Sequence, residues 1–376
     1  MMKNRFSFLA LLLLSTLQLQ PSVFAQGSLT PAGAPAPTMK TLDQIEARTP
    51  IDTAHTPGDA NHQFIISAPG SYYLTGNITG VSGKHGILIN ADNVTLDLNG
   101  FALIGTLGIF TLDGITMSAQ HRNLRVCNGT VDNWYGSGIN CGGSSNSQFD
   151  HLRVAQNNGY GIVCGDGSVL NSCTAEVNDF QGFSTGQRCT LTGCTSTANG
   201  FDGIETGNYC TITACTSNGN LNPYAGFNIG GDCTIIGCCA DNNYDGISAS
   251  YACTIKDCIA NNNREDGITV GITSTVVNCI ANSNATNGIY CQSECLISGN
   301  NACDNQNGIR SGGNVNRIDG NTASSNGRVG ILWVNDLVIR NTAFLNGTAN
   351  YSPAVGTGNT GPLNSASTST NPWANF

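Results

Sequence analysis

Acidic side chains recur at one position of this sequence, directly before a glycine that opens a short apolar segment. Asp245 and Asp266 are the two such carboxylates closest together, and Glu265 lies beside Asp266. Carboxylate oxygens are the ligands that Ca²⁺ prefers, so these three residues predict a calcium site. Aspartate before glycine is also a favoured turn pair, and a plain turn is the alternative interpretation.

Aromatic side chains occupy a second repeated position, two residues before the same glycine. They are Phe180, Phe201, Tyr224 and Tyr244. Rings placed at a regular spacing along a surface can stack on the apolar faces of sugar rings, which predicts a carbohydrate-binding site. They can equally stack on one another and cover a turn. Neighbouring segments add three further rings that could extend the platform: Trp134, Tyr135 and Tyr160.

Residues with recognisable catalytic chemistry are sparse. The sequence holds no nucleophile elbow, phosphate loop or zinc-protease motif, and its five histidines all precede Gly161, from which the repeat described below is regular. Lys and Arg number 15 against 24 Asp and Glu, a net charge of −9 with no basic cluster, which argues against nucleic-acid binding. No residue is therefore assigned a catalytic role.

A repeat of about 21 residues organises the chain. Glycine followed by isoleucine or phenylalanine marks its phase at Gly86, Gly114, Gly138, Gly161, Gly182, Gly203, Gly226, Gly246, Gly267, Gly288, Gly308 and Gly330. An aliphatic column keeps the same phase from Leu170 to Val338. Three residues after it comes a column that changes from cysteine to asparagine: Cys173, Cys194, Cys215, Cys238, Cys258, Cys279, Asn300, Asn321 and Asn341. Five residues further on, an unbroken asparagine column runs from Asn178 to Asn346.

Each repeat is predicted to form one coil of a parallel β-solenoid. Short segments such as 210–213 alternate small apolar and polar residues, which is typical of half-buried strands. The intervening Gly, Asn, Asp and Ser residues favour turns. Equivalent residues of successive coils then lie ~4.8 Å apart, so aliphatic side chains fill the interior and asparagines pass hydrogen bonds along the stack. We predict an all-β rod of about 12 coils.

The opening of the repeat region resembles a known family. Residues 69–77 (PGSYYLTGN) and 94–100 (VTLDLNG) are similar to the first coils of β-helix repeat proteins exported by bacteria. Residues 64–346 resemble the secreted right-handed parallel β-helix proteins of the pectin-lyase-like superfamily. The resemblance implies a right-handed, single-stranded parallel β-helix with a polysaccharide on the outer face of one sheet. It implies no particular chemistry, because this fold hosts lyases, hydrolases, epimerases and adhesins.

Two features bear on the activity that such a fold would carry. The polygalacturonase-like motifs Asn-Thr-Asp, Asp-Asp, Gly-His-Gly and Arg-Ile-Lys are absent. On the predicted outer face, two residues after each repeated glycine, Glu205 and Arg310 are the only charges. They stand five coils apart, about 24 Å by strand spacing, too far for one reacting centre. We interpret this column as a solvated strand face.

The 17 cysteines allow three interpretations. Five-residue spacing along strand-like segments is too wide for bridges within a coil, and parallel side chains on neighbouring coils fit a disulfide poorly. We interpret most cysteines as small buried apolar residues, with some inter-coil disulfides as the alternative. A zinc site is the third interpretation. It is the least favoured, because zinc ligands converge on one point whereas these cysteines are dispersed along a rod.

Both ends of the chain differ from the repeat. Residues 1–25 read as a signal peptide cleaved near Ala25, and 26–40 as a flexible lead-in. Residues 41–63 are predicted to cap the rod, with a short helix over 41–47. The β-helix spans 64–346, and 347–376 form an irregular tail whose Trp373 and Phe376 fold back over the last coil. No later segment is long and apolar enough for a membrane anchor.

These observations predict an exported protein that is secreted, periplasmic or on the cell surface. Its predicted function is that of a non-catalytic carbohydrate-binding or cell-envelope scaffold module, with a polysaccharide or envelope glycan as partner. The alternative is a polysaccharide-processing enzyme, most plausibly a calcium-assisted lyase, for which Ca²⁺ is the candidate cofactor.

Overall fold

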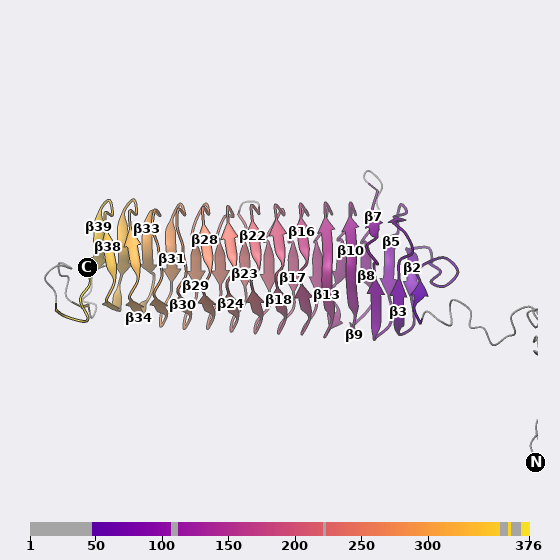
Figure 1. Ribbon diagram of the computed structural model, residues 1–376, viewed down its shortest axis with the longest axis horizontal. Coiled ribbons are helices and arrows are strands. Elements are labelled where there is room, and N and C mark those ends of the chain that lie inside the picture. Colours follow the sequence, from indigo (N-terminus) through magenta and orange to yellow (C-terminus); the bar gives the residue numbers. More distant parts are fainter. Residues whose placement is uncertain (1–46, 107–111, 221–222, 354–359, 362–369) are drawn as a thin grey trace, which may run out of the picture. The chain divides into compact units, whose positions relative to one another are not determined.

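A computed structural model describes residues 47–106, 112–220, 223–353, 360–361 and 370–376, and these contain strands and no helix. Sheet 1 has one strand from each coil, in sequence order along the rod formed by residues 48–376 (Figure 1). Its strands are β2 (His62–Ile66), β5 (His85–Ile89), β8 (Ile115–Met117), β11 (Ile139–Cys141), β14 (Ile162–Cys164), β17 (Phe183–Thr185), β20 (Ile204–Thr206), β23 (Phe227–Ile229), β26 (Ile247–Ala249), β29 (Ile268–Val270), β31 (Asn287–Cys291), β33 (Asn307–Ser311), β36 (Val329–Trp333) and β39 (Ala349–Pro353).

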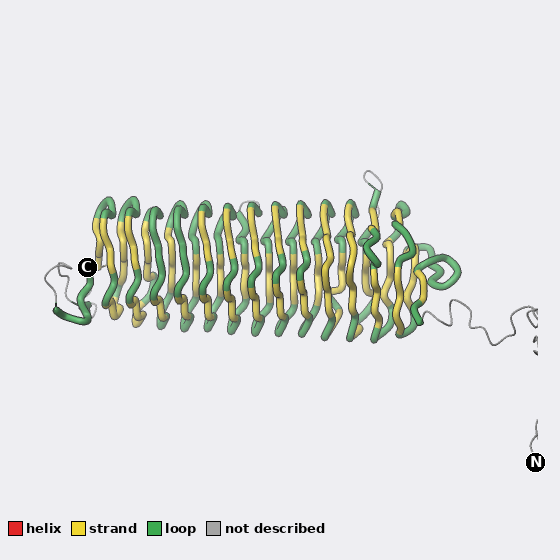
Figure 2. The backbone as a smooth tube through the Cα atoms, in the orientation of Figure 1, coloured by secondary structure: helices red, strands yellow, loops and turns green. Residues whose placement is uncertain are grey.

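Sheet 2 takes up to two further short strands from each coil (Figure 2), and its strands pair in parallel. Its strands are β1 (Thr49–Pro50), β3 (Gly70–Tyr73), β4 (Ile78–Thr79), β6 (Val94–Asp97), β7 (Ala102–Ile104), β10 (Arg125–Asp132), β13 (Gln148–Ala155), β15 (Val169–Asn171), β16 (Thr174–Glu176), β18 (Thr190–Thr192), β19 (Thr195–Thr197), β21 (Thr211–Thr213), β22 (Thr216–Asn218), β24 (Thr234–Ile236), β25 (Cys239–Asp241), β27 (Thr254–Lys256), β28 (Ile259–Asn261), β30 (Thr275–Val277), β32 (Leu296–Ser298), β34 (Asn314–Asp319) and β37 (Asn335–Ile339). Two small pairs complete the described strands, β9 (His121–Arg122) with β12 (Ser144–Ser145) and β35 (Thr322–Ser324) with β38 (Thr342–Phe344).

The parallel solenoid is confirmed, and its length is corrected to 14 coils from the predicted 12. The prediction counted one coil for each repeated glycine, and it omitted the first and last coils because neither contains that glycine. Phe64 pairs with Ile87, which places Gln63 at the glycine position of the first coil. Tyr351 pairs with Ile331, which places Asn350 there in the last coil. The pairing therefore continues beyond residue 346 into the segment predicted to be irregular.

The repeated glycine marks a position where the backbones of successive coils approach closely. A Cβ atom built on Gly246 would lie 2.4 Å from the carbonyl oxygen of Gly267 in the next coil and 2.7 Å from Nδ2 of Asn263. Both distances are shorter than atoms tolerate. Glycine recurs here because a side chain would push the coils apart.

The predicted asparagine ladder is present and fully buried at its centre. Oδ1 of Asn199 accepts hydrogen bonds from the backbone N–H (3.0 Å) and Nδ2 (2.9 Å) of Asn178. Nδ2 of Asn199 in turn donates to Oδ1 of Asn220 at 3.2 Å. The same contact links successive rungs up to Asn346 and begins one coil earlier than predicted, at Asn157.

The cysteines form similar columns, and their thiols act as ladder groups. Within the cysteine-to-asparagine column, the backbone N–H of Cys238 donates to Sγ of Cys258 at 3.4 Å, whereas the N–H of Cys279 donates to Oδ1 of Asn300 at 2.8 Å. Thiol and amide thus serve one purpose at this position, which explains why cysteine changes to asparagine along the column. None of the 17 cysteines, all of which lie in described ranges, forms a disulfide, and all except Cys239 are buried.

The N-terminal end of the rod is covered by the segment that follows residue 47. Strand β1 pairs with β3, and the backbone N–H of Ile65 in β2 donates to the carbonyl of Thr56. Pro57 forms an antiparallel bridge with Phe64. The predicted signal peptide, lead-in and helix over 41–47 lie outside the described residues, apart from Ala47. The described residues contain no helix long and apolar enough to cross a membrane.

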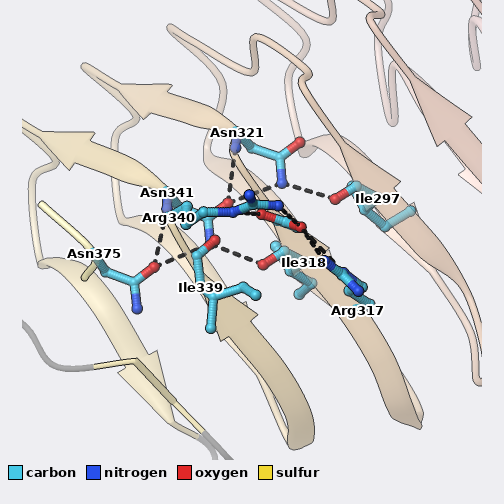
Figure 3. A network of polar contacts seen from close by, with 9 residues as sticks. Ile297, Arg317, Ile318, Asn321, Ile339, Arg340, Asn341 and Asn375 are labelled. Atoms are coloured by element: carbon cyan, nitrogen blue, oxygen red, sulfur yellow. Dashed lines mark hydrogen bonds and ion pairs between the residues drawn. The ribbon is translucent and has the colours of Figure 1, made fainter. Parts of the chain in front are cut away.

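The last residues of the chain fold back and supply one more rung of the cysteine-to-asparagine column (Figure 3). Oδ1 of Asn375 accepts from the backbone N–H of Asn341 at 3.0 Å, and its Nδ2 donates to the carbonyl of Val338 at 2.9 Å. The backbone N–H of Phe376 donates to the carbonyl of Asn341 at 2.8 Å. These contacts cover strand edges that would otherwise be open to other chains.

Asp319 is expected to make stability fall in acid. Burial alone raises its pKa, but hydrogen bonds and charges from Arg340 and Arg317 hold the pKa of this carboxyl below its usual 3.8. A carboxyl with a depressed folded pKa stabilises the fold above its unfolded pKa, and that contribution is lost as the pH falls through the folded pKa. The melting temperature should therefore drop more steeply between about pH 5 and pH 2 for the wild type than for Asp319→Asn. Parallel profiles would contradict this assignment.

Candidate functional site

The predicted aromatic column forms a continuous stack at the start of the sheet 1 strands. The ring centroids of Phe180 and Phe201 lie 4.9 Å apart with an interplanar angle of 15°. Those of Phe201 and Tyr224 lie 4.2 Å apart. Tyr160 joins the other end, 5.3 Å from Phe180. Four rings on four successive coils thus make one ridge, hereafter the aromatic ridge.

The geometry of the aromatic ridge decides which parts of the rings can meet a ligand. Because the rings stack on one another, their inner faces are covered and their outward edges remain; Phe180 is 38% exposed. Tyr244 does not continue the stack among the described ring contacts, and its hydroxyl donates to Oε1 of Glu265 at 3.3 Å. The ridge is therefore a line of ring edges rather than a row of open faces.

The other two neighbouring rings behave differently from each other. Trp134 is 0% exposed, and its indole N–H donates to the carbonyl of Leu103 at 3.1 Å, so the expectation that it extends the platform is wrong. It lies two residues after the end of β10 and its side chain turns into the core, which the sequence spacing did not indicate. Tyr135, the next residue, is exposed.

Polar side chains line the outer face of sheet 1 beside the aromatic ridge. Glu205 accepts hydrogen bonds from Nε2 of Gln181 at 3.0 Å and from the hydroxyl of Ser184 at 3.3 Å. Asn228 donates to Oδ2 of Asp202 at 3.1 Å. Burial raises the pKa of Asp202 above its usual value, although hydrogen bonds from Asn228 and the backbone of Ala225 oppose this. The face offers hydroxyl, amide and carboxyl groups held in place by their neighbours.

A groove of about 510 Å³ lies at the opposite end of the same strands. Its floor is formed where β14 and β17 end, and Val163 and Ser184, both on the outer face of sheet 1, line it. Four glycines line it: Gly142, Gly143, Gly165 and Gly186. A Cβ on Gly165 would lie 1.9 Å from the carbonyl oxygen of Ser144, so no larger residue fits there.

Sequence reasoning missed this groove. Its polar lining includes residues from segments far apart in the sequence, such as Gln120 beside β9 and Asp166 after β14. The one available signal was the Gly142–Gly143 pair together with the glycine that directly follows several sheet 1 strands. That signal indicates a turn in any solenoid and does not predict that the turns border a groove.

The three acidic residues predicted to bind calcium lie on two adjacent coils. Oδ1 of Asp245 accepts from the backbone N–H of Asp266 at 3.0 Å, and Oδ1 of Asp266 accepts from Asn287 at 2.8 Å. Glu265 accepts from the hydroxyls of Tyr244 and Thr286. No group of three or more His, Cys, Asp or Glu side chains suited to a metal ion is found within the described residues. Calcium binding here stays a prediction.

The two charged residues of the outer column are separate, as their spacing indicated. Arg310 lies over the ring of Tyr290, with its guanidinium carbon 5.7 Å from the ring centroid. Glu205 is engaged by Gln181 and Ser184 as described above. The outer face thus brings together the aromatic ridge, a polar strip and the groove, and it gathers these features around β14, β17, β20 and β23.

Comparison with known proteins agrees with the fold. The sequence model of the right-handed β-helix region matches residues 183–302. This match supports the predicted right-handed β-helix. No curated protein matches the sequence.

Solved structures with a similar backbone are distant in sequence. The A-module of a mannuronan C-5 epimerase from Azotobacter vinelandii is 16% identical, with a TM-score of 0.48 over 77% of this chain and 90% of that one. A periplasmic alginate epimerase is 11% identical, with a TM-score of 0.42 over 82% and 81%. A pectate lyase is 17% identical, with a TM-score of 0.32 over 82% and 74%.

Proposed function

We propose that this protein is an exported, non-catalytic carbohydrate-binding module that holds an extended polysaccharide against the outer face of sheet 1. The observation that carries the proposal is the aromatic ridge running along four coils beside a strip of polar side chains. A polymer of sugar rings presents alternating apolar C–H surface and hydroxyl groups, and both find partners on this face.

The mode of binding follows from the stacking. The covered ring faces leave the electropositive edges of Phe180, Phe201 and Tyr224 outward, where they contact sugar oxygens and C–H groups. Ser184, Glu205 and Asn228 provide hydrogen-bond donors and acceptors for hydroxyls. Because coils repeat every ~4.8 Å, the same set of contacts recurs along the rod, which favours an extended polymer over a single sugar.

The double variant Phe201→Ala/Tyr224→Ala should lose at least about tenfold in affinity for the bound polysaccharide, because two neighbouring rings disappear from the ridge. Electrophoretic retardation in gels containing a panel of acidic and neutral polysaccharides measures this. The variant should remain folded, since ring pairs contribute only about 0.5–1.5 kcal/mol each.

Tyr209→Ala is the matched control. Tyr209 is 53% exposed and lies in the turn between β20 and β21, away from the aromatic ridge. Its loss should leave retardation unchanged. Retardation that is equal in the wild type and the double variant would reject the ridge as the binding site.

The lyase alternative makes a different prediction for the same samples. The carboxyls of Asp202 and Asp245 have raised pKa values because burial disfavours their charged forms, and buried carboxyls of this kind occur in active sites. A lyase would release products with unsaturated uronate absorbance in a calcium-dependent manner. A binding module retards the polymer and releases nothing.

A further inference from the structure

The C-terminal end of the rod carries a second groove, on sheet 2. This groove of about 480 Å³ opens between β37, the end of β34 and the folded-back C-terminal segment. Leu337 and Ile339 form its apolar floor, Thr360 and Gly361 close one end, and Trp373 and Arg317 form the walls. The indole of Trp373 is 50% exposed, unlike Trp134 and Trp333, which are buried.

Charge is unbalanced at this groove. Arg317 and Arg340 both bind Asp319, which is 3% exposed (Figure 3). The guanidinium of Arg317 uses Nε (3.1 Å) and Nη2 (2.7 Å), and that of Arg340 uses the same two nitrogens, so one carboxylate receives four hydrogen bonds. Two positive charges are thus set against one negative charge.

The spare donors of this cluster face solvent. The side chains of Arg317 and Arg340 are 49% and 47% exposed, and within the described part of the chain their Nη1 groups make no hydrogen bond. Arg340 also lies over Trp373, its guanidinium carbon 5.6 Å from the ring centroid. Asp319 therefore fixes both guanidinium planes while leaving an outer N–H edge of each available. This arrangement is unusual in a chain with 15 Lys and Arg against 24 Asp and Glu.

We propose that this groove binds a carboxylate carried on a six-membered ring. The carboxylate accepts charge-assisted hydrogen bonds from the free guanidinium edges, and the ring packs against Trp373 and Leu337. A uronic acid unit and an aromatic carboxylic acid both have this chemistry. The site is independent of the proposed carbohydrate track, because it lies on the other sheet and shares no residue with it.

Titration of the full chain with sodium glucuronate and with sodium benzoate tests the proposal, with glucose at matched ionic strength as the uncharged comparison. Trp373 is the exposed tryptophan, so its fluorescence reports on the groove, and calorimetry provides a second readout. We expect a saturable signal with at least one carboxylate and none with glucose. Saturation by glucuronate identifies a sugar acid as the ligand class, and saturation by benzoate alone identifies an aromatic acid.

Variants separate the site from general charge effects. Arg317→Gln should weaken binding about tenfold or more while Arg340 still pairs with Asp319 and keeps it neutralised. Trp373→Phe should abolish the fluorescence change and leave the calorimetric signal detectable. Arg188→Gln removes a charge that lies over Tyr209 elsewhere on the rod and should change nothing. No saturation with either carboxylate, or equal affinity in Arg317→Gln, would overturn the proposal.

Discussion

Gly246→Ala is expected to lower the free energy of unfolding by about 3 kcal/mol or more, a large loss for the addition of one methyl group. The new Cβ would lie 2.4 Å from the carbonyl oxygen of Gly267 and 3.0 Å from Cβ of Ala260. The first of these atoms belongs to the backbone of the next coil and cannot rotate away. The methyl group must therefore separate two coils and weaken the hydrogen bonds between β26 and β29.

The same substitution at Gly76 is the control. A Cβ on Gly76 meets no atom within 4 Å. Gly76→Ala should change stability by less than about 0.5 kcal/mol. Denaturant midpoints followed by circular dichroism measure both variants, and similar midpoints for the two would show that the coils can separate at little cost.

Asn199→Ala is expected to cost about 3–6 kcal/mol, because it leaves several buried polar groups without partners. Two N–H groups of Asn178 lose their acceptor, and the carbonyl of Ala175 loses a donor at 3.2 Å. Asn199 itself is 0% exposed, so water does not reach the vacated position from the surface. Each unsatisfied buried group costs about 1–3 kcal/mol.

Asn218→Ala provides the comparison one coil further along. Asn218 is half-buried on the outer side of β22, where water can replace its contacts. Its loss should change stability by less than about 0.5 kcal/mol. Hydrogen exchange should also show faster opening of the coils around Asn199 in the ladder variant, because a solenoid transmits damage mainly to its neighbours. Equal effects of the two substitutions would mean that the ladder contributes little.

The repeat itself carries most of the fold. A period of about 21 residues with glycine, aliphatic and asparagine columns specifies parallel coils. Stacking places identical or similar residues above one another, and each column then has one structural role. The aromatic column of the candidate site could be predicted for the same reason, because residues at the same position of successive repeats lie above one another in a solenoid. The columns also predicted the ladder contacts of Asn178 and Asn199.

The direction in which a side chain points and the contacts made by the chain ends were decided only by the tertiary structure. Spacing did not show that Trp134 turns into the core or that the rings of the aromatic ridge cover each other's faces, because a column fixes height along the rod but not orientation around a bond. The two end coils lack the glycine that marks the phase.

The C-terminal groove could not be predicted from the sequence. Asn375 bonds to Asn341, 34 residues earlier, and so completes a column that has a period of about 21 residues elsewhere. Trp373 reaches Arg340 only because of that return. Sequence periodicity determines which residues stack from coil to coil, whereas contacts made by a chain folding back on itself follow from packing, and packing is decided in three dimensions.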